Sequence, residues 1–119
     1  MTPKALAEFR ARLPDCELAV YADIRSGTVL LKDGVLRYPQ EYLDALCECA
    51  ALLFRDDPGF DGAPTDPILF FGPTGGRAFF RAPDDPSEAL CCICGSKTDI
   101  AALLSAGKAL LAPVDEASL

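Results

Sequence analysis

The chain has 119 residues, a formal net charge of −7 and a sequence pI of about 4.4. This length is typical of a single domain, so we expect one compact core. The acidic balance, with no offsetting cluster of Lys and Arg, disfavours nucleic acid and anionic membranes as partners. No apolar run approaches the roughly 20 residues that cross a bilayer, and the charged first turns do not resemble a secretory signal. We therefore expect a cytoplasmic protein without membrane insertion.

The first part of the sequence predicts a helix followed by a β-hairpin. Apolar residues recur at helical spacing over residues 3–13, and Thr2 is placed as the N-cap. The stretches 17–24 and 28–32 are rich in β-forming residues. Gly27 lies between them and can adopt the positive φ that the hairpin turn requires.

The middle of the chain carries the strongest helical pattern, over residues 40–55. Its polar residues fall on one narrow stripe, and apolar residues cover the rest of its circumference. Such a helix needs more cover than a single sheet provides, so we expect a partner molecule to contact it. The alternative is a helix sandwiched within its own chain. The residues expected at the contact are Tyr42, Leu46, Cys49, Ala50 and Leu53.

The second half predicts three more strands. The stretches 68–71 and 77–80 flank a Gly-rich turn and form a second predicted hairpin. A turn over 83–86 leads to a strand over 89–94 that is apolar on both faces. A strand of this kind belongs in the interior of a sheet.

A last helix is expected over residues 98–111, with Ser96 or Thr98 as its cap. Residues 1–113 then form one domain, and 114–119 a flexible C-terminal tail. The element order is α-β-β-α-β-β-β-α. The natural solution is an α+β fold in which helices pack on a five-stranded, mainly antiparallel sheet.

The order of elements and three stretches of the sequence resemble one known family. They are the hairpin over Val20–Leu30, the apolar helix around Leu43–Phe54, and the last strand with its helix cap over Leu90–Ile100. Together they resemble the roadblock/dynein light chain superfamily, whose fold is related to profilin and the longin domains. The resemblance covers nearly the whole chain. The Asp/Pro/Gly-rich loop over 56–66 and the turn over 83–86 depart from the common pattern of that family.

The resemblance implies a function in protein assembly. Members of this family form homodimers or heterodimers through the second helix and an adjoining sheet edge. They act as regulators or scaffolds of small GTPases and motors. We therefore expect a homodimer that regulates or scaffolds a partner such as a small GTPase.

The sequence contains no His. This absence removes Ser-His-Asp and Cys-His catalysis and the usual catalytic zinc sites. We expect no enzymatic activity and no cofactor.

The cysteines favour packing over chemistry. Strand alternation sends Cys92 and Cys94 to one face and Cys91 to the other, while Cys47 and Cys49 diverge on their helix. Reduced thiols in a core fit this placement better than disulfides, a metal or redox chemistry. A metal site would require the last strand and the middle helix to pack together.

Two other stretches could form binding sites but are better explained by local structure. The stretch Gly95-Ser96-Lys97-Thr98 lies where a phosphate-binding loop would lie, but it lacks the Walker glycines, so helix capping is favoured. The acidic residues around 56–66 and 84–88 lack EF-hand spacing and are typical of solvated turns.

Two rival functions remain open. One is an acidic, secretion-type chaperone that binds an unfolded segment of its client, a class that usually has three strands before the middle helix. The other is a small-ligand-sensing domain with a pocket between sheet and helices.

Overall fold

The computed structural model describes residues 1–35, 37–54 and 66–112. The predicted domain end at residue 113, the tail over 114–119 and nearly all of the predicted loop over 56–66 lie outside these residues. Within them, no helix combines the length and the hydropathy needed to cross a bilayer. The elements follow in the expected order: α1 (Pro3–Ala11), β1 (Cys16–Asp23), β2 (Thr28–Gly34), α2 (Gln40–Phe54), β3 (Ile68–Gly72), β4 (Gly75–Arg81), β5 (Glu88–Cys94) and α3 (Ile100–Leu111).

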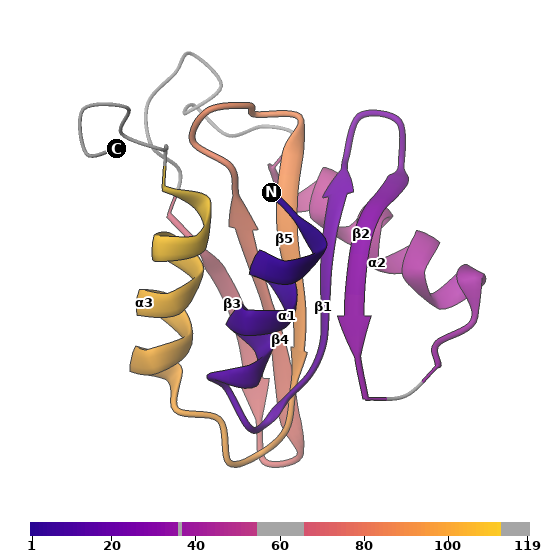
Figure 1. Ribbon diagram of the computed structural model, residues 1–119. Coiled ribbons are helices and arrows are strands. Elements are labelled where there is room, and N and C mark those ends of the chain that lie inside the picture. Colours follow the sequence, from indigo (N-terminus) through magenta and orange to yellow (C-terminus); the bar gives the residue numbers. More distant parts are fainter. Residues whose placement is uncertain (36, 55–65, 113–119) are drawn as a thin grey trace, which may run out of the picture.

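The five strands form one sheet in the order β2-β1-β5-β4-β3, and every neighbouring pair is antiparallel (Figure 1). Strand β5 lies at the centre of the sheet, as its apolar sequence predicts. Strands β2 and β3 form the two edges. The fold class expected from the sequence is therefore confirmed.

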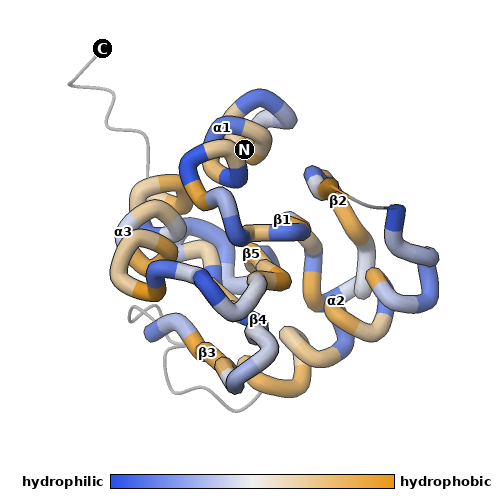
Figure 2. The backbone as a smooth tube through the Cα atoms, turned by 90° about the horizontal axis from the view of Figure 1, so that it is seen from below, coloured by the Kyte–Doolittle hydropathy of each residue, from blue (hydrophilic) through white to orange (hydrophobic). Residues whose placement is uncertain are grey.

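Helices cover both faces of the sheet. Helices α1 and α3 lie on one face and α2 on the other (Figures 1 and 2). Each face carries its own apolar core. The core under α2 includes Val20, Leu43, Leu46, Phe54, Phe79 and Cys91. The core under α1 and α3 includes Leu6, Phe9, Phe80, Leu90, Cys92 and Leu103.

The helix caps match the sequence prediction at α1 but not at α3. Thr2 Oγ1 accepts a hydrogen bond of 3.1 Å from Ala5 N, as expected for an N-cap. The prediction of Ser96 or Thr98 as the cap of α3 is wrong. Asp99 Oδ1 accepts from Ala102 N at 3.1 Å, so α3 starts two residues later than predicted.

Strand β2 contains a bulge at Leu30. Tyr21 on β1 pairs with Leu31, and Ala22 pairs with Val29, so Leu30 has no partner on β1. Because of the extra residue, Val29 packs in the core under α2 whereas Leu31 packs in the opposite core. Leu30 itself is 45% exposed. The bulge therefore interrupts this edge of the sheet halfway along.

Candidate functional site

Helix α2 divides the predicted contact residues into two groups. Leu46 and Ala50 are only 2% and 0% exposed and lie in the core between α2 and the sheet. Both side chains hold α2 onto its own sheet, and their place near a partner contact stays a prediction. Tyr42, Cys49 and Leu53 are partly exposed. For these three, too, the partner contact remains a prediction.

Leu52 belongs to the widened apolar side of α2, and the structure leaves this side chain 55% exposed. Because α2 packs mainly on β2, β1 and β5, its outer side is not covered by another helix of the described ranges. The wide apolar surface of α2 therefore has two parts with different surroundings. Part of it fills the core of the chain, and part of it faces outward.

Strand β3 adds an exposed aromatic residue beside this side of α2. Phe70 is 53% exposed, and its ring contacts Phe79 edge-on, with 6.4 Å between ring centroids. Phe70 lies opposite Arg77 on β4. Neither Phe70 nor Arg77 was expected as a site residue from the sequence. Alternation along β3 places Phe70 on the same face as Ile68, so this pattern could have indicated Phe70 from the sequence.

Arg77 connects the sheet to α2. Its Nη2 donates a hydrogen bond of 3.2 Å to the Tyr42 hydroxyl, and its guanidinium lies 5.6 Å from the centroid of the Tyr42 ring. Tyr38 also stacks on Tyr42, with 5.2 Å between the two ring centroids. We call the following set the α2–β3 surface: Tyr42, Cys49, Leu52, Leu53, Phe70 and Arg77.

The two edges of the sheet differ in their chemistry. Strand β3 has the sequence Ile-Leu-Phe-Phe-Gly, with no charge, no proline and an unbroken register to β4. Strand β2 has the bulge at Leu30 and the charges of Lys32 and Asp33. Bulges and edge charges discourage strand pairing, whereas a flat apolar edge permits it. Among the described residues, the edge next to the α2–β3 surface is therefore the one more open to strand pairing.

The cysteines lie in the two cores. Cys91 faces α2, while Cys92 and Cys94 face α1 and α3, as strand alternation predicts. Cys94 lies opposite Cys16 on β1. Contact with the Cys92 thiol, together with burial, raises the pKa of Cys16 to about 12. Burial likewise raises the pKa of Cys91. These thiols stay protonated at neutral pH, which suits packing and not metal binding or nucleophilic attack.

Helix α2 and strand β5 do pack together, and Cys47 and Cys91 share one core. Even so, across residues 1–35, 37–54 and 66–112 no three Cys, Asp or Glu side chains are grouped so that they could hold a metal ion.

The stretch before α3 uses its polar groups internally. Lys97 N donates to Asp15 Oδ2 at 2.6 Å, and Gly95 N donates to Asp15 O at 2.8 Å. The Thr98 hydroxyl donates to the Gly95 carbonyl at 2.8 Å. Asp15 places a carboxylate where a phosphate group would have to bind. The structure therefore favours a structural role for this loop.

The polar groups of the acidic turn before β5 also form hydrogen bonds within the chain. Asp85 Oδ1 accepts hydrogen bonds from Ser87 N at 3.0 Å and from the Ser87 hydroxyl at 2.6 Å, and Glu88 accepts from the Tyr21 hydroxyl. The bonds from Ser87 lower the pKa of Asp85. This is the turn chemistry that the sequence indicates.

Comparison with solved structures identifies the fold. The roadblock/LC7 domain from Streptomyces avermitilis superimposes with a TM-score of 0.74 at 17% identity, over 92% of this chain and 91% of that one. MglB in a tetrameric arrangement gives 0.72 at 17% identity, over 91% and 80%. The gliding protein MglB from Thermus thermophilus gives 0.68 at 16% identity, over 90% and 80%. No family model and no curated protein matches the sequence. The chain has the roadblock/LC7 fold, and at these identities the likeness shows the fold alone.

Proposed function

We propose that this chain is a non-catalytic protein-interaction module that forms a homodimer through β3 and the α2–β3 surface. The observation that carries the proposal is the coincidence of two features on one side of the molecule. The open edge strand β3 lies beside exposed apolar side chains, of which Leu52 and Phe70 are more than half exposed. Pairing of two β3 strands would satisfy their edge hydrogen-bonding groups and bury these side chains together.

In the assembled state, the module regulates or scaffolds a partner protein such as a small GTPase. This part rests on the family resemblance and on a structural neighbour described in a tetrameric arrangement. Within the sequence itself, the absence of His supports a role without catalysis.

The order of elements argues against the chaperone alternative. Secretion-type chaperones usually place three strands before the middle helix, whereas only β1 and β2 precede α2 in the described part of this chain. The ligand-sensing alternative has less support because buried side chains fill the middle of both faces of the sheet, and the hollows beside α2 lie only along its edge strand β2.

Sedimentation velocity over a range of concentrations tests the dimer. We expect the unmodified chain to sediment as a dimer and Leu52→Glu to shift it to a monomer, because the new charge would be desolvated at the contact. The matched control is Leu30→Glu, which adds the same charge at an exposed leucine on the other edge. A monomeric unmodified chain at high concentration, or equal effects of the two variants, would refute the proposal.

A further inference from the structure

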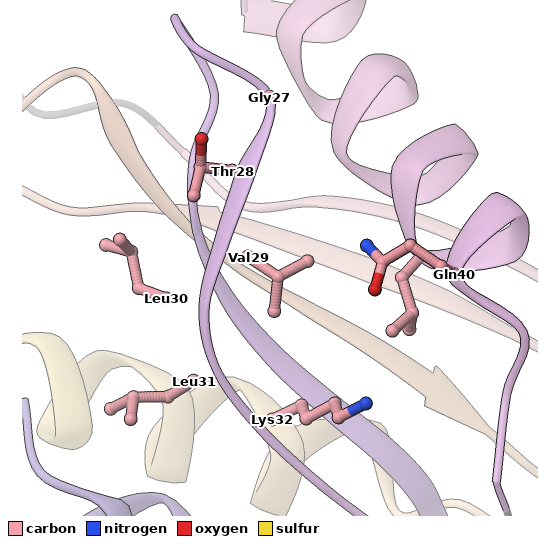
Figure 3. A pocket seen from close by; sticks show the side chains of 8 residues that line it. Gly27, Thr28, Val29, Leu30, Leu31, Lys32 and Gln40 are labelled. Atoms are coloured by element: carbon pink, nitrogen blue, oxygen red, sulfur yellow. The ribbon is translucent and has the colours of Figure 1, made fainter.

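A groove lies between β2 and the start of α2, at the opposite edge of the sheet from β3. It consists of two adjoining hollows of about 460 and 540 Å³, which share Lys32 and Leu43 in their walls. Figure 3 shows the side chains of Val29, Lys32 and Gln40 directed into the space between strand and helix. Leu18 and Leu43, which are 2% and 1% exposed, form its apolar floor.

The charges that line this groove have one dominant sign. Lys32 and Arg37 are both exposed, and within the described ranges neither has an ion-pair partner. Asp33 also borders the groove, but Arg10 of α1 binds it on the other face of the sheet, with 2.5 Å between Nε and Oδ2. Burial and the nearby Glu17 carboxylate raise the pKa of Tyr38, which lines the groove. Two cations without an ion-pair partner among the described residues therefore lie over an apolar floor, on a chain whose net charge is −7.

The backbone of β2 adds hydrogen-bonding groups to the same groove. Val35 N donates to Glu17 O at 3.0 Å, continuing the ladder between β2 and β1. In an antiparallel pair, alternate residues direct their backbone groups toward the neighbouring strand and away from it. Since Val35 bonds toward β1, the N–H and C=O groups of Lys32 and Gly34 point to the outer edge. Both residues line the groove.

From these observations we infer that the groove docks an extended, acidic segment of a partner protein, which pairs with β2 over Lys32–Gly34. Apolar side chains of the segment would enter the hollows above Leu43, and its carboxylates would meet Lys32 and Arg37. The bulge at Leu30 confines such pairing to the second half of β2. Lys32 also makes the site selective, because it repels another β2 strand and attracts a segment of opposite charge. This surface is separate from the α2–β3 surface, so the inference does not depend on dimerisation.

The experiment uses the full chain, ¹⁵N-labelled, and a capped hexapeptide of alternating Val and Glu as the probe. Two-dimensional NMR should show shifts at Leu31–Gly34 and at Gln40, with slower exchange of the Lys32 and Gly34 amides. Binding should weaken as salt rises, because exposed charge pairs are screened. The same peptide with Lys in place of Glu should not bind.

Charge reversal provides the matched control. Lys32→Glu with Arg37→Glu should weaken binding of the acidic probe about tenfold, since each exposed pair contributes modestly. Lys97→Glu with Lys108→Glu makes the same change in net charge away from the groove and should have little effect. Sedimentation of both double variants should match that of the unmodified chain, which separates failure here from failure of the proposed dimer.

Three outcomes would overturn the inference. The first is an absence of shifts along β2 at millimolar probe, and the second is equal weakening by the two double variants. The third is preference for a Glu-Ser peptide without apolar residues, or for anionic lipid vesicles, because the apolar hollows would then have no role.

Discussion

Gly107 of α3 lies directly against the ring of Phe80 on β4. A Cβ atom at position 107 would come within 2.5 Å of Phe80 Cε2 and 2.6 Å of Cζ. Phe80 is 2% exposed and fixed in the core, so the ring has little room to retreat. The glycine allows α3 to approach the sheet at this point.

Gly107→Ala should therefore destabilise the fold, although alanine normally favours a helix over glycine by up to about 1 kcal/mol. We expect a net loss of roughly 1–3 kcal/mol from overpacking, measured by urea unfolding. Ser105→Ala, at an exposed position of the same helix, is the control. A smaller loss in the background of Phe80→Leu would locate the clash at the ring. Unchanged or increased stability of Gly107→Ala would contradict the packing described.

Leu46 and Leu52 lie on the same helix but should respond differently to truncation. Leu46→Ala removes a buried side chain and should cost about 2–5 kcal/mol. Leu52→Ala should change the stability of the monomer by less than about 0.5 kcal/mol. Urea unfolding at two protein concentrations distinguishes the roles, because a core loss is independent of concentration and an interface loss is not. A loss at Leu46 that varied with concentration would place this residue at the interface.

Asp15 holds the loop between β5 and α3. Asp15→Ala removes the acceptor of the Lys97 amide, which should cost roughly 1–2 kcal/mol and speed hydrogen exchange at Lys97. Asp84→Ala, at an exposed turn position, is the comparison and should leave that amide unaffected. Unchanged protection of Lys97 in Asp15→Ala would show that the bond contributes nothing.

Stability should fall as pH rises above about 9. The Cys92 contact and burial raise the pKa of Cys16 from 9.0 to about 12 in the folded chain. Burial and the Glu88 contact also raise the pKa of Tyr21. Above the unfolded-state pKa, the unfolded chain loses protons that the folded chain keeps, so stability is present below about pH 9 and lost toward about pH 12.

Denaturant midpoints measured from about pH 8 to 11 test this expectation. For each thiol that stays protonated, the slope approaches about 1.4 kcal/mol per pH unit. Cys16→Ala should show a shallower decline. A midpoint that stayed constant through about pH 10.5 would be inconsistent with these shifts.

In the monomeric Leu52→Glu variant, which leaves the α2–β3 surface uncovered, Cys49 should be the one thiol that reacts readily. It is partly exposed on α2, whereas the other five cysteines are 4% exposed or less. Iodoacetamide at about pH 8 should add one label by mass spectrometry, and Cys49→Ser should abolish it. If Cys91 or Cys92 were labelled equally fast, the β5 core would be more open than the structure indicates.

Much of the fold follows from local patterns in the sequence. Gly27 has φ of +70°, as the hairpin turn requires, and β5 carries apolar residues on both sides because it lies at the centre of the sheet. Helical and strand periods are properties of neighbouring residues, so they can be read without knowing the fold.

Predictions from the sequence fall short mainly where contacts between distant segments determine the structure. Periodicity shows that α2 is apolar over a wide arc, but only the direction of its sheet buries Leu46 and Ala50 and leaves Leu52 exposed. The misplaced cap of α3 is a local error: the Thr98 hydroxyl donates to the Gly95 carbonyl, and Asp99 accepts the hydrogen bond from Ala102 N. The groove beside β2 could not be predicted, because it needs the register of β2 and the position of α2 together.

The difference between the two edge strands of the sheet also limits the size of the assembly. If two copies join through β3, the outer strands of the combined sheet are two β2 strands, each kinked at Leu30 and carrying Lys32. Like charges and broken register then oppose the addition of a third copy. A self-complementary interface of this kind is fully occupied once two copies have joined. The chain should therefore form an assembly of fixed size and resist elongation into fibres.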